Sequence, residues 1–399
     1  MSSTRAPEPI YLDHAATTPV RPEVFDAMLP FLGARFGNPS STHRWGREAR
    51  VALDEARERV AATLGAHTAE ICFTSGGTEA DNLAILGVWR TRRETRPAVV
   101  TSPFEHKAVL ETVHQVAREG GEERCCRVTA DGLVDVGSVE ALTDEWTALV
   151  SIMWVNNEIG TIQDVPRIAQ STKARGALMH TDAVQAFGKV ALDLSTLPVD
   201  LLSISGHKIG APKGIGAMFV RRGVQIEPLF HGGAQDRGRR PGTENVAFAV
   251  ALATAAELAV RDREKEQARL RALRDELENA ILAAVPDAIV HGLKAPRVGH
   301  ITSVSVPGID AESLLMALDL EGIGASAGSA CQSGSVSPSH VLAAMGVRPE
   351  IATAAVRMSL GSLSSEEAIR HVAERFPALV RRARDFSGLA AESAALAQV

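Results

Sequence analysis

The sequence predicts an α/β protein of two domains, the larger one built around a mostly parallel β-sheet. With 399 residues the chain is longer than one hydrophobic core usually serves. From about residue 65 to residue 220, short β-rich runs alternate with helical patterns, which is typical of βαβ units. After Gly242 the sequence changes to a long segment rich in Ala, Leu, Arg and Glu, which indicates a long helix leading into a second domain.

The predicted strands of the large domain are apolar along most of their length, as strands covered on both faces should be. They span residues 70–74, 98–102, 148–154, 177–180, 200–205 and 217–220. Before them, apolar residues recur every three or four positions and predict an amphipathic helix over residues 49–64. We also expect a strand to begin at Cys125 and Cys126.

The second domain is predicted to be a compact α+β unit. Leu270, Leu273, Leu277 and Ile281 form one stripe of a connecting helix. Beyond it we expect a strand over residues 303–306, helices over residues 312–320 and 366–376, and a terminal helix from Leu389. We place the boundary near residue 260, so that residues 16–260 form the large domain and residues 1–15 with 261–399 the small one.

Composition excludes several classes of function. Apolar residues make up 45% and charged residues 23%, which is the balance of a soluble globular protein. The net charge of −6 offers no basic surface for a nucleic acid. Four cysteines without a CxxC pair predict neither a disulfide framework nor a structural metal site. With no signal peptide and no membrane span in the sequence, we expect a cytoplasmic enzyme acting on a small molecule.

Polar residues follow the predicted strands, at the edge where open parallel sheets bind ligands. After the first strand come Gly76, Gly77 and Thr78, directly before a helical run, and this order suits a phosphate at a helix N-terminus. Taken alone, a Gly-Gly turn that caps a helix is the commoner explanation.

The next three strand ends carry His106, then Asn156 and Asn157, then Asp182 and Gln185. Each has an ordinary structural explanation, since a loop histidine is usually structural, paired asparagines cap turns and an aspartate caps helices.

The fifth strand end carries Lys208, which follows His207 between two glycines. Most lysines are solvated surface charges. Together with a phosphate site, an aromatic histidine and a carboxylate for a pyridine nitrogen, however, this amine completes the set of groups that pyridoxal 5′-phosphate requires.

Motifs along nearly the whole chain resemble the class V pyridoxal-phosphate enzymes, and within them the cysteine desulfurases of the NifS/IscS type. They are Tyr-Leu-Asp-His-Ala-Ala-Thr-Thr at 11–18, Gly-Asn-Pro-Ser-Ser at 37–41 and Val-Arg-Met-Ser-Leu-Gly at 356–361. The resemblance implies the fold type I of pyridoxal-phosphate transferases, with a seven-stranded type of sheet covered by helices and a smaller α+β domain. It also implies a homodimer with shared active sites.

By the same resemblance Lys208 would form the Schiff base with the cofactor, and His106 would stack on its ring and move protons. Asp182 would pair with the ring nitrogen and Gln185 with the ring hydroxyl. The residues placed around the phosphate are Gly77, Thr78, Ser205, His207 and, from the neighbouring subunit, Thr243. Those placed around the substrate are Asn38, Arg357 and Asn157, the last of which would also contact the cofactor.

Cys331 lies in a segment of small residues that offers almost no apolar surface for packing, which favours an accessible thiol. In the family, the cysteine of such a segment takes sulfur from L-cysteine as a persulfide, releases alanine and delivers the sulfur to a protein acceptor. The acceptor could be an iron–sulfur scaffold or a tRNA-thiolating enzyme, and the sequence leaves this open. A selenocysteine lyase or another class V lyase is the alternative enzyme, and a non-catalytic sulfur-transfer partner is the alternative from another class.

Overall fold

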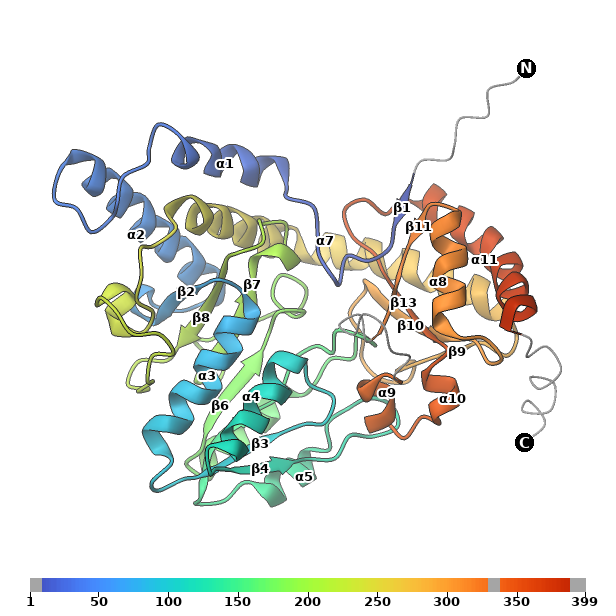
Figure 1. Cartoon of the computed structure of the whole chain (residues 1–399), viewed down its shortest axis with the longest axis horizontal. Helices are drawn as coiled ribbons and strands as arrows, with labels where there is room; N and C mark the ends of the chain where they lie inside the picture. The colour runs from blue at the N-terminus through green and yellow to red at the C-terminus, as the bar shows by residue number, and fades with distance from the viewer. Residues whose placement is uncertain (1–8, 329–337, 388–399) are drawn as a thin grey trace.

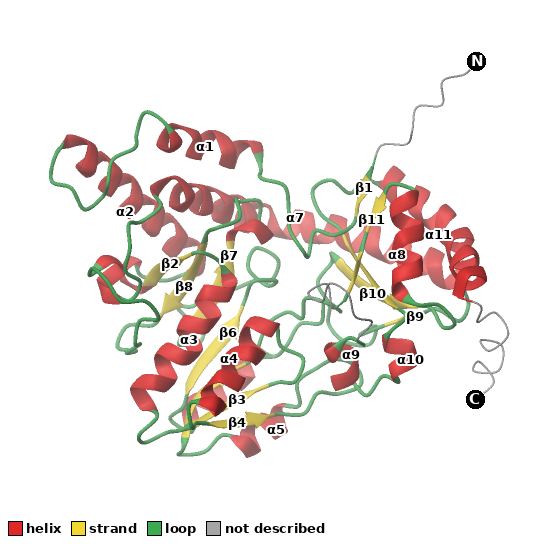
Figure 2. Ribbon diagram, viewed as in Figure 1, coloured by secondary structure: helices red, strands yellow, loops and turns green. Residues whose placement is uncertain are grey.

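The computed structural model describes residues 9–328 and 338–387, and shows two groups of elements joined by one long helix (Figure 1). The N-terminal group surrounds a seven-stranded sheet, and the C-terminal group surrounds a four-stranded one (Figure 2). Among the described helices, none combines the length and the apolar character needed to cross a membrane.

The large sheet has the predicted mixed character with mostly parallel strands. Its order is β2 (Ile71–Thr74), β8 (Gly216–Val220), β7 (Leu201–Ser205), β6 (Leu178–Asp182), β5 (Thr147–Ser151), β3 (Ala98–Thr101) and β4 (Glu122–Cys125). Strand β8 is antiparallel to both neighbours, and the pairs from β7 to β4 are parallel. All six predicted strands are present, and the α/β fold class is confirmed.

Strand β4 corrects one prediction. We expected a strand to begin at Cys125, but β4 ends there. This strand lies at the sheet edge, pairs only with β3 and exposes Glu122 and Cys125. An edge strand with water on one side needs no apolar run, so its Glu-Glu-Arg-Cys sequence gave no strand signal.

Two apolar layers cover the two faces of the sheet. Successive side chains of a strand point to opposite faces, so each strand contributes residues to both layers. In β8, Ala217 and Phe219 belong to one core cluster, whereas Met218 and Val220 belong to the other. The first layer includes residues of α1 (Pro22–Leu32), α2 (Arg44–Leu64), α5 (Val136–Leu142), α6 (Val165–Ala174) and the start of α7 (Val246–Ala284). The second layer is formed by α3 (Gly77–Arg92) and α4 (Lys107–Arg118). The stripe predicted for residues 49–64 is the buried face of α2.

Helix α7 runs from one core to the other. Its first half, to Leu258, packs in the large core, and the predicted stripe from Leu270 to Ile281 packs in the C-terminal core. Residue 260, our predicted boundary, lies inside this helix at the end of its contacts with the large core.

The small sheet is antiparallel, in the order β12 (Ser326–Ala327), β13 (Ala355–Ser359), β10 (Ile301–Ser305) and β9 (Ile289–Val290). Helices α8 (Ala311–Leu320) and α11 (Glu366–Ser387) pack in its core, with α9 (His340–Ala344) and α10 (Pro349–Ala352) nearby. The predicted strand and both predicted helices are present with shifted ends, while the helix expected from Leu389 lies outside the described residues. Strand β1 (Ile10–Tyr11) pairs with β11 (Ile323–Gly324), so the N-terminal segment begins beside the C-terminal group.

A buried ion pair fixes the loop that precedes α7. Arg57 of α2 donates to Asp236 at 2.7 Å, and both side chains are about 95% buried, with exposures of 5% and 3%. Asp236 also accepts the backbone N–H of Phe73 in β2 at 3.0 Å, and Arg57 donates to the Ile71 carbonyl at 2.8 Å. These bonds hold Asp236 in a left-handed conformation with φ of 48°, which a non-glycine residue adopts only when its surroundings stabilise it.

Replacing Asp236 by Ala should lower the free energy of unfolding by about 3–5 kcal/mol, because Arg57 would stay buried and keep only its longer ion pair with Glu244, at 3.5 Å. The control is Asp54→Ala, which removes an exposed pair with Arg50 on the same helix and should cost less than about 1 kcal/mol. Denaturant unfolding of both variants checks this, and equal losses would contradict it.

Candidate active site

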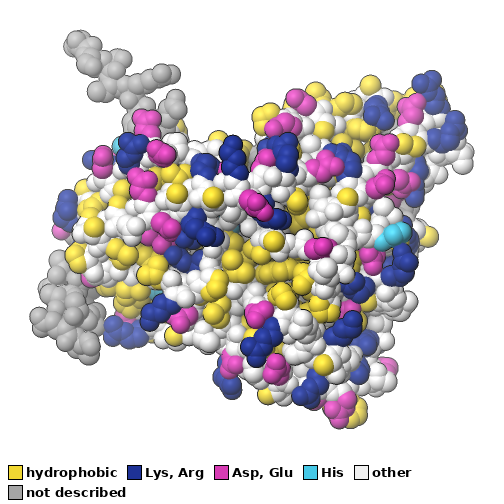
Figure 3. Space-filling view, turned by 180° about the vertical axis from the view of Figure 1, so that it is seen from behind, with side chains coloured by type: hydrophobic (Ala, Val, Ile, Leu, Met, Phe, Trp, Pro, Cys, Tyr) yellow, Lys and Arg dark blue, Asp and Glu magenta, His cyan; other side chains and the backbone are white. Residues whose placement is uncertain are grey.

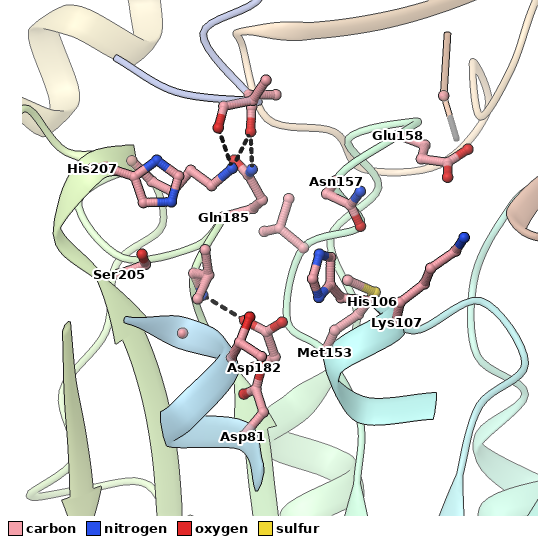
Figure 4. Close-up of a pocket in the computed structure, with 18 of the residues that line it drawn as sticks. Asp81, His106, Lys107, Met153, Asn157, Glu158, Asp182, Gln185, Ser205 and His207 are labelled. Atoms are coloured by element: carbon pink, nitrogen blue, oxygen red, sulfur yellow. Dashed lines mark hydrogen bonds between the residues drawn. The ribbon is translucent and has the colours of Figure 1, made fainter. Parts of the chain in front are cut away.

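A cavity of about 360 Å³ opens at the carboxyl ends of the sheet strands (Figure 4). It brings together ten of the thirteen predicted site residues. These are Gly77, Thr78, His106, Asn157, Asp182, Gln185, Ser205, His207, Lys208 and Arg357. They come from positions scattered over 281 residue numbers, so the clustering is a property of the fold and not of the sequence order.

Lys208 lies in a short 3₁₀ turn, η2 (Gly206–Lys208), directly after β7. Its Nζ donates to the carbonyls of Ala15 at 2.6 Å and Ala16 at 2.7 Å (Figure 4). The following residue of the same segment, Thr17, contacts His207 Nδ1 through Oγ1 at 3.1 Å. The N-terminal segment therefore forms the wall against which the amine is held.

The start of α3 provides an anion site. Gly76 is the N-cap and no side chain caps the helix among the described residues, so the first-turn N–H groups are open to a ligand. A β-carbon added at Gly77 would come within 2.8 Å of Val184 and 3.6 Å of the Ser205 Cβ. A backbone this close to its neighbours needs glycine. The hydroxyls of Thr78 and Ser205 and the His207 ring lie around it, which fits the phosphate of the cofactor.

Asp182 lies at the end of β6 and is buried. Its Oδ1 accepts the Val184 N–H at 2.8 Å, and no helix follows it, so the helix-capping explanation does not hold. Burial raises the pKa of this carboxyl, whereas the neighbouring charges of His106 and Lys208 lower that pKa. The charge of Lys208 thus favours the ionised form that a protonated pyridine nitrogen needs, against the effect of burial.

Two further buried carboxyls lie close to Asp182. Burial, and then the charge of Asp182, raise the pKa of Asp81 well above its ordinary range. Burial raises the pKa of Glu105 to about 8, although the Ser102 hydroxyl and the Met153 N–H oppose this. Glu105 therefore holds its proton at neutral pH, and burial favours the neutral form of Asp81 as well.

His106 is the N-cap of α4, and its Nδ1 accepts the Ala108 N–H at 3.1 Å. In the neutral ring the proton is therefore on Nε2. Burial lowers the pKa of this imidazole, and the charge of Asp182 opposes the shift. A neutral ring of fixed orientation suits both stacking and proton exchange.

Two amide oxygens at the cavity have no partner among the described residues. They are Asn157 Oδ1 and Gln185 Oε1, both buried. The Gln185 Nε2 donates to the Ala15 carbonyl at 2.9 Å, which fixes the orientation of the amide (Figure 4). Buried acceptors without donors are costly, so these oxygens fit a ligand that brings hydroxyl or N–H groups. The ring hydroxyl of pyridoxal phosphate is such a group.

Arg357 of β13 is 3% exposed, so its ion pair with Asp13 is a buried one and not an exposed surface pair. Its Nη2 donates to Asp13 Oδ1 and to Ser326 Oγ, each at 2.8 Å, and its Nη1 donates to the Asn157 carbonyl at 3.0 Å. Its Nε has no partner among the described residues. The guanidinium thus lines the cavity in a fixed position, with donor capacity left for an anion.

Three predicted site residues are not brought into the cavity. Asn38 is exposed, and its Oδ1 accepts the Ser40 N–H at 2.9 Å. Thr243 is also exposed and does not line the cavity of its own chain. Cys331 lies outside the described residues, three positions along the chain after Gly328, which does line the cavity.

Sequence reasoning missed several lining residues, among them Asp81, Lys107, Glu158 and His340. Asp81 is four residues after Gly77 on the same helix, so helical spacing could have indicated it. Glu158 directly follows Asn157. His340 gave no signal, because only the fold brings α9 to the large sheet.

The aminotransferase class-V family model matches residues 10–372. The chain belongs to this family. Family members use pyridoxal phosphate, so the predicted cofactor and fold type are confirmed. The chain is 42% identical to the cysteine desulfurase IscS of Dictyoglomus turgidum, over 95% of this chain and 96% of that protein. It is 44% identical to the cysteine desulfurase IscS of Methanosarcina thermophila, over 95% and 94%.

Solved structures of related proteins also resemble this chain along most of its length. A NifS-like protein superposes with a TM-score of 0.88 at 37% identity, covering 94% of this chain and 99% of that one. DndA from Streptomyces lividans superposes with a TM-score of 0.75 at 39% identity, covering 88% and 99%. The class V resemblance seen in the sequence is confirmed.

Glu105 gives this class V site a testable pH dependence. Its folded-state pKa of about 8 lies above the ordinary 4.5, so its contribution to stability is fully present below 4.5 and is lost as pH rises through 8. Glu105→Gln removes this titration. Thermal unfolding should therefore show the variant becoming more stable relative to the wild type from about pH 4.5 to about pH 8, with a constant difference above that pH. Parallel curves for the two proteins would contradict the prediction.

Proposed function

We propose that the chain is a pyridoxal-phosphate-dependent cysteine desulfurase, which converts L-cysteine and an acceptor thiol to L-alanine and a persulfide. The single observation that carries the proposal is the cavity itself. It holds the Lys208 amine, the buried Asp182 carboxylate and the Arg357 guanidinium, and Gly328 at its wall leads within three residues to Cys331. Three extended residues span at most about 11 Å, so the connection is short.

The residues that would hold the cofactor are Lys208 through its amine, the start of α3 with Ser205 and His207 around the phosphate, and Asp182 at the ring nitrogen. When bound, the cofactor withdraws electrons from the carbons of an amino acid joined to it, which weakens the C–S bond of cysteine. The rest of the chemistry belongs to the side chains of the chain.

Arg357 would bind the substrate carboxylate through its planar guanidinium, with Asn157 beside it. Lys208 and His106 would exchange protons with the substrate carbons. Lys208 suits this role because the carbonyls of Ala15 and Ala16 hold its amine at the cavity wall. His106 suits it because its free ring position carries the proton of the neutral tautomer.

The Cys331 thiolate would attack the sulfur of the bound cysteine. An S–S bond forms as the C–S bond breaks, and the electron pair of the broken bond goes to the substrate carbon, which takes up a proton to give alanine. Only the thiolate is nucleophilic, so the step requires deprotonation of the thiol. The outer sulfur of the persulfide then passes to an acceptor thiol.

Two alternatives share parts of this site. A selenocysteine lyase or another class V lyase would use the same cofactor residues, and a comparison of turnover of cysteine and selenocysteine distinguishes them. A non-catalytic sulfur-transfer partner would not need the Lys208 amine in the cavity, so visible absorption of the bound cofactor argues against it. The names of the relatives favour the desulfurase.

Replacing Cys331 by Ala should abolish sulfur release but leave the cofactor bound and yellow, because no described contact of the cavity depends on this residue. Wild-type enzyme incubated with L-cysteine should carry added sulfur on Cys331 by peptide mass spectrometry, with Cys125 as the exposed control thiol. Full activity of the Cys331→Ala variant would refute the assignment.

The proposed partner of the chain is a second copy of itself. Large apolar side chains are exposed on α1 and α2 and between them, namely Val20, Phe25, Leu29, Leu32, Phe36, Trp45 and Val51. On α1 they are spaced four and three residues apart and so share one face. Figure 3 shows that hydrophobic side chains also gather near the middle of the rear face, with charged side chains around them. Such surfaces mark interfaces. A partner subunit also accounts for Thr243, which our sequence analysis assigns to the neighbouring active site.

The double variant Phe25→Glu with Leu29→Glu should raise the dimer dissociation constant by about a hundredfold or more, because it buries charges against their symmetry copies. Met316→Glu, at a more exposed position on α8, is the control and should leave the dimer intact. Analytical ultracentrifugation measures both. A monomeric wild type would refute the homodimer.

We also propose a large domain of residues 16–260 and a small domain of residues 1–15 with 261–399. The two sheets with separate cores support this division.

The proposed acceptor of the sulfur is an iron–sulfur scaffold or a tRNA-thiolating enzyme. The proposed compartment is the cytoplasm.

A further inference from the structure

Glu158 is a buried carboxylate at the cavity wall that the proposed reaction does not use. It is 2% exposed and follows a turn built by Asn156. The Asn156 Oδ1 accepts the N–H groups of Glu158 at 2.9 Å and Ile159 at 3.1 Å, and its Nδ2 donates to the Phe104 carbonyl at 3.0 Å. This turn fixes the side chain of Glu158 at the opposite side of the cavity from His207 (Figure 4).

The Glu158 carboxylate contacts the chain after the Cys331 segment, which comprises residues 329–337. Ser339 Oγ donates to Glu158 Oε2 at 2.5 Å and also accepts the Leu342 N–H at 3.2 Å, which caps α9. The neighbouring His340 is held by the Glu105 carbonyl, 2.9 Å from its Nε2, and its Nδ1 lies 4.0 Å from Glu158 Oε1. Glu158 thus holds the start of α9 at the cavity wall.

The same carboxylate packs against the chain before the segment. A β-carbon added at Gly328 would overlap Glu158 Oε2 and lie 3.1 Å from Glu158 Cδ, so only glycine allows the contact. Gly328 follows β12, where Ser326 bonds to both Asp13 and Arg357. One carboxylate therefore contacts both flanks of the Cys331 segment, beside the proposed substrate-binding guanidinium.

We infer that Glu158 is a positioning residue that ties the two flanks of the Cys331 segment together at the cavity wall. The inference rests on the proposed role of Cys331 as the sulfur-accepting nucleophile. A fixed pair of chain ends restricts where the residues between them can reach, and attack on a bound substrate gains rate from such restriction. Glu158 acts through Ser339 and Gly328 and takes no part in proton or sulfur transfer.

The test compares Glu158→Ala with the conservative Glu158→Gln in the holoenzyme. The amide of Glu158→Gln keeps an oxygen acceptor for Ser339, whereas Glu158→Ala keeps none. Ser339→Ala removes the same hydrogen bond from the other side, without altering a cavity-lining side chain. Asp164→Ala is the matched control, because it removes an exposed carboxylate that caps α6 a few residues further along the chain.

Three measurements separate positioning from a general loss of structure. The dissociation constant for L-cysteine is read from the absorption change of the bound cofactor. The rate of persulfide formation on Cys331 is read in a single turnover by mass spectrometry. The rate of alkylation by iodoacetamide is compared between Cys331 and the exposed Cys125 of the same molecule.

For Glu158→Ala and Ser339→Ala we expect persulfide formation to slow by about tenfold or more, the factor that corresponds to a lost hydrogen bond to a charged group. We expect the L-cysteine dissociation constant to stay within about twofold, since Arg357 keeps its partners, and alkylation of Cys331 to change relative to Cys125. Glu158→Gln should fall between these variants and the wild type, and Asp164→Ala should match the wild type.

Unchanged persulfide formation and unchanged Cys331 alkylation in Glu158→Ala and Ser339→Ala would overturn the inference, and so would equal changes at Cys331 and Cys125. Should Glu158→Ala fail to fold, Gly328→Ala provides the same test, because its added methyl group displaces the carboxylate. Failure of the proposed function is distinguishable, because it would leave the wild-type Cys331 without any persulfide.

Discussion

The structure depends on the placement of one lysine amine. Lys208 donates to the carbonyls of Ala15 and Ala16, which belong to a segment that pairs with β11 through β1 and then reaches the cavity at the large sheet. These two hydrogen bonds fix the amine at the cavity wall, where it can meet a cofactor. The proposed active site therefore requires both groups of elements in register, and neither would form it alone.

Three buried carboxyls lie near one another at the cavity, and they differ in the charged groups around them. Asp182 shares its surroundings with His106 and Lys208, which favour its charged form, while Asp81 and Glu105 are pushed toward their neutral forms. The charge of Asp182 contributes to the raised pKa of the other two carboxyls. Asp182 is the one of the three whose ionised form is favoured by neighbouring positive charge, and its position is fixed, which is what a ring nitrogen needs in a partner.

The sequence predicted the sheet from local signals, because strands covered on both faces form apolar runs. Asp182 and Lys208 became candidates because they follow strand ends, whereas their roles, and the choice of Ser205 and Arg357, came from the resemblance to class V enzymes. Strand β4 was not predicted at its observed position, because it is an edge strand and its sequence has no apolar run. The long-range contacts of Glu158 with Ser339 and of Asp13 with Arg357 could not be read from spacing, since each joins residues far apart that only the packed fold brings together. Asn38 and Thr243 are a different case, because a single chain does not place them in its own cavity.

Helix α7 joins the two cores without a break over 39 residues, and the N-terminal segment crosses between the same two groups a second time. The two crossings fix the positions of the two groups relative to each other. A single proline in the middle of α7, far from every residue assigned to the reaction, would therefore disturb the alignment of both walls of the cavity at once.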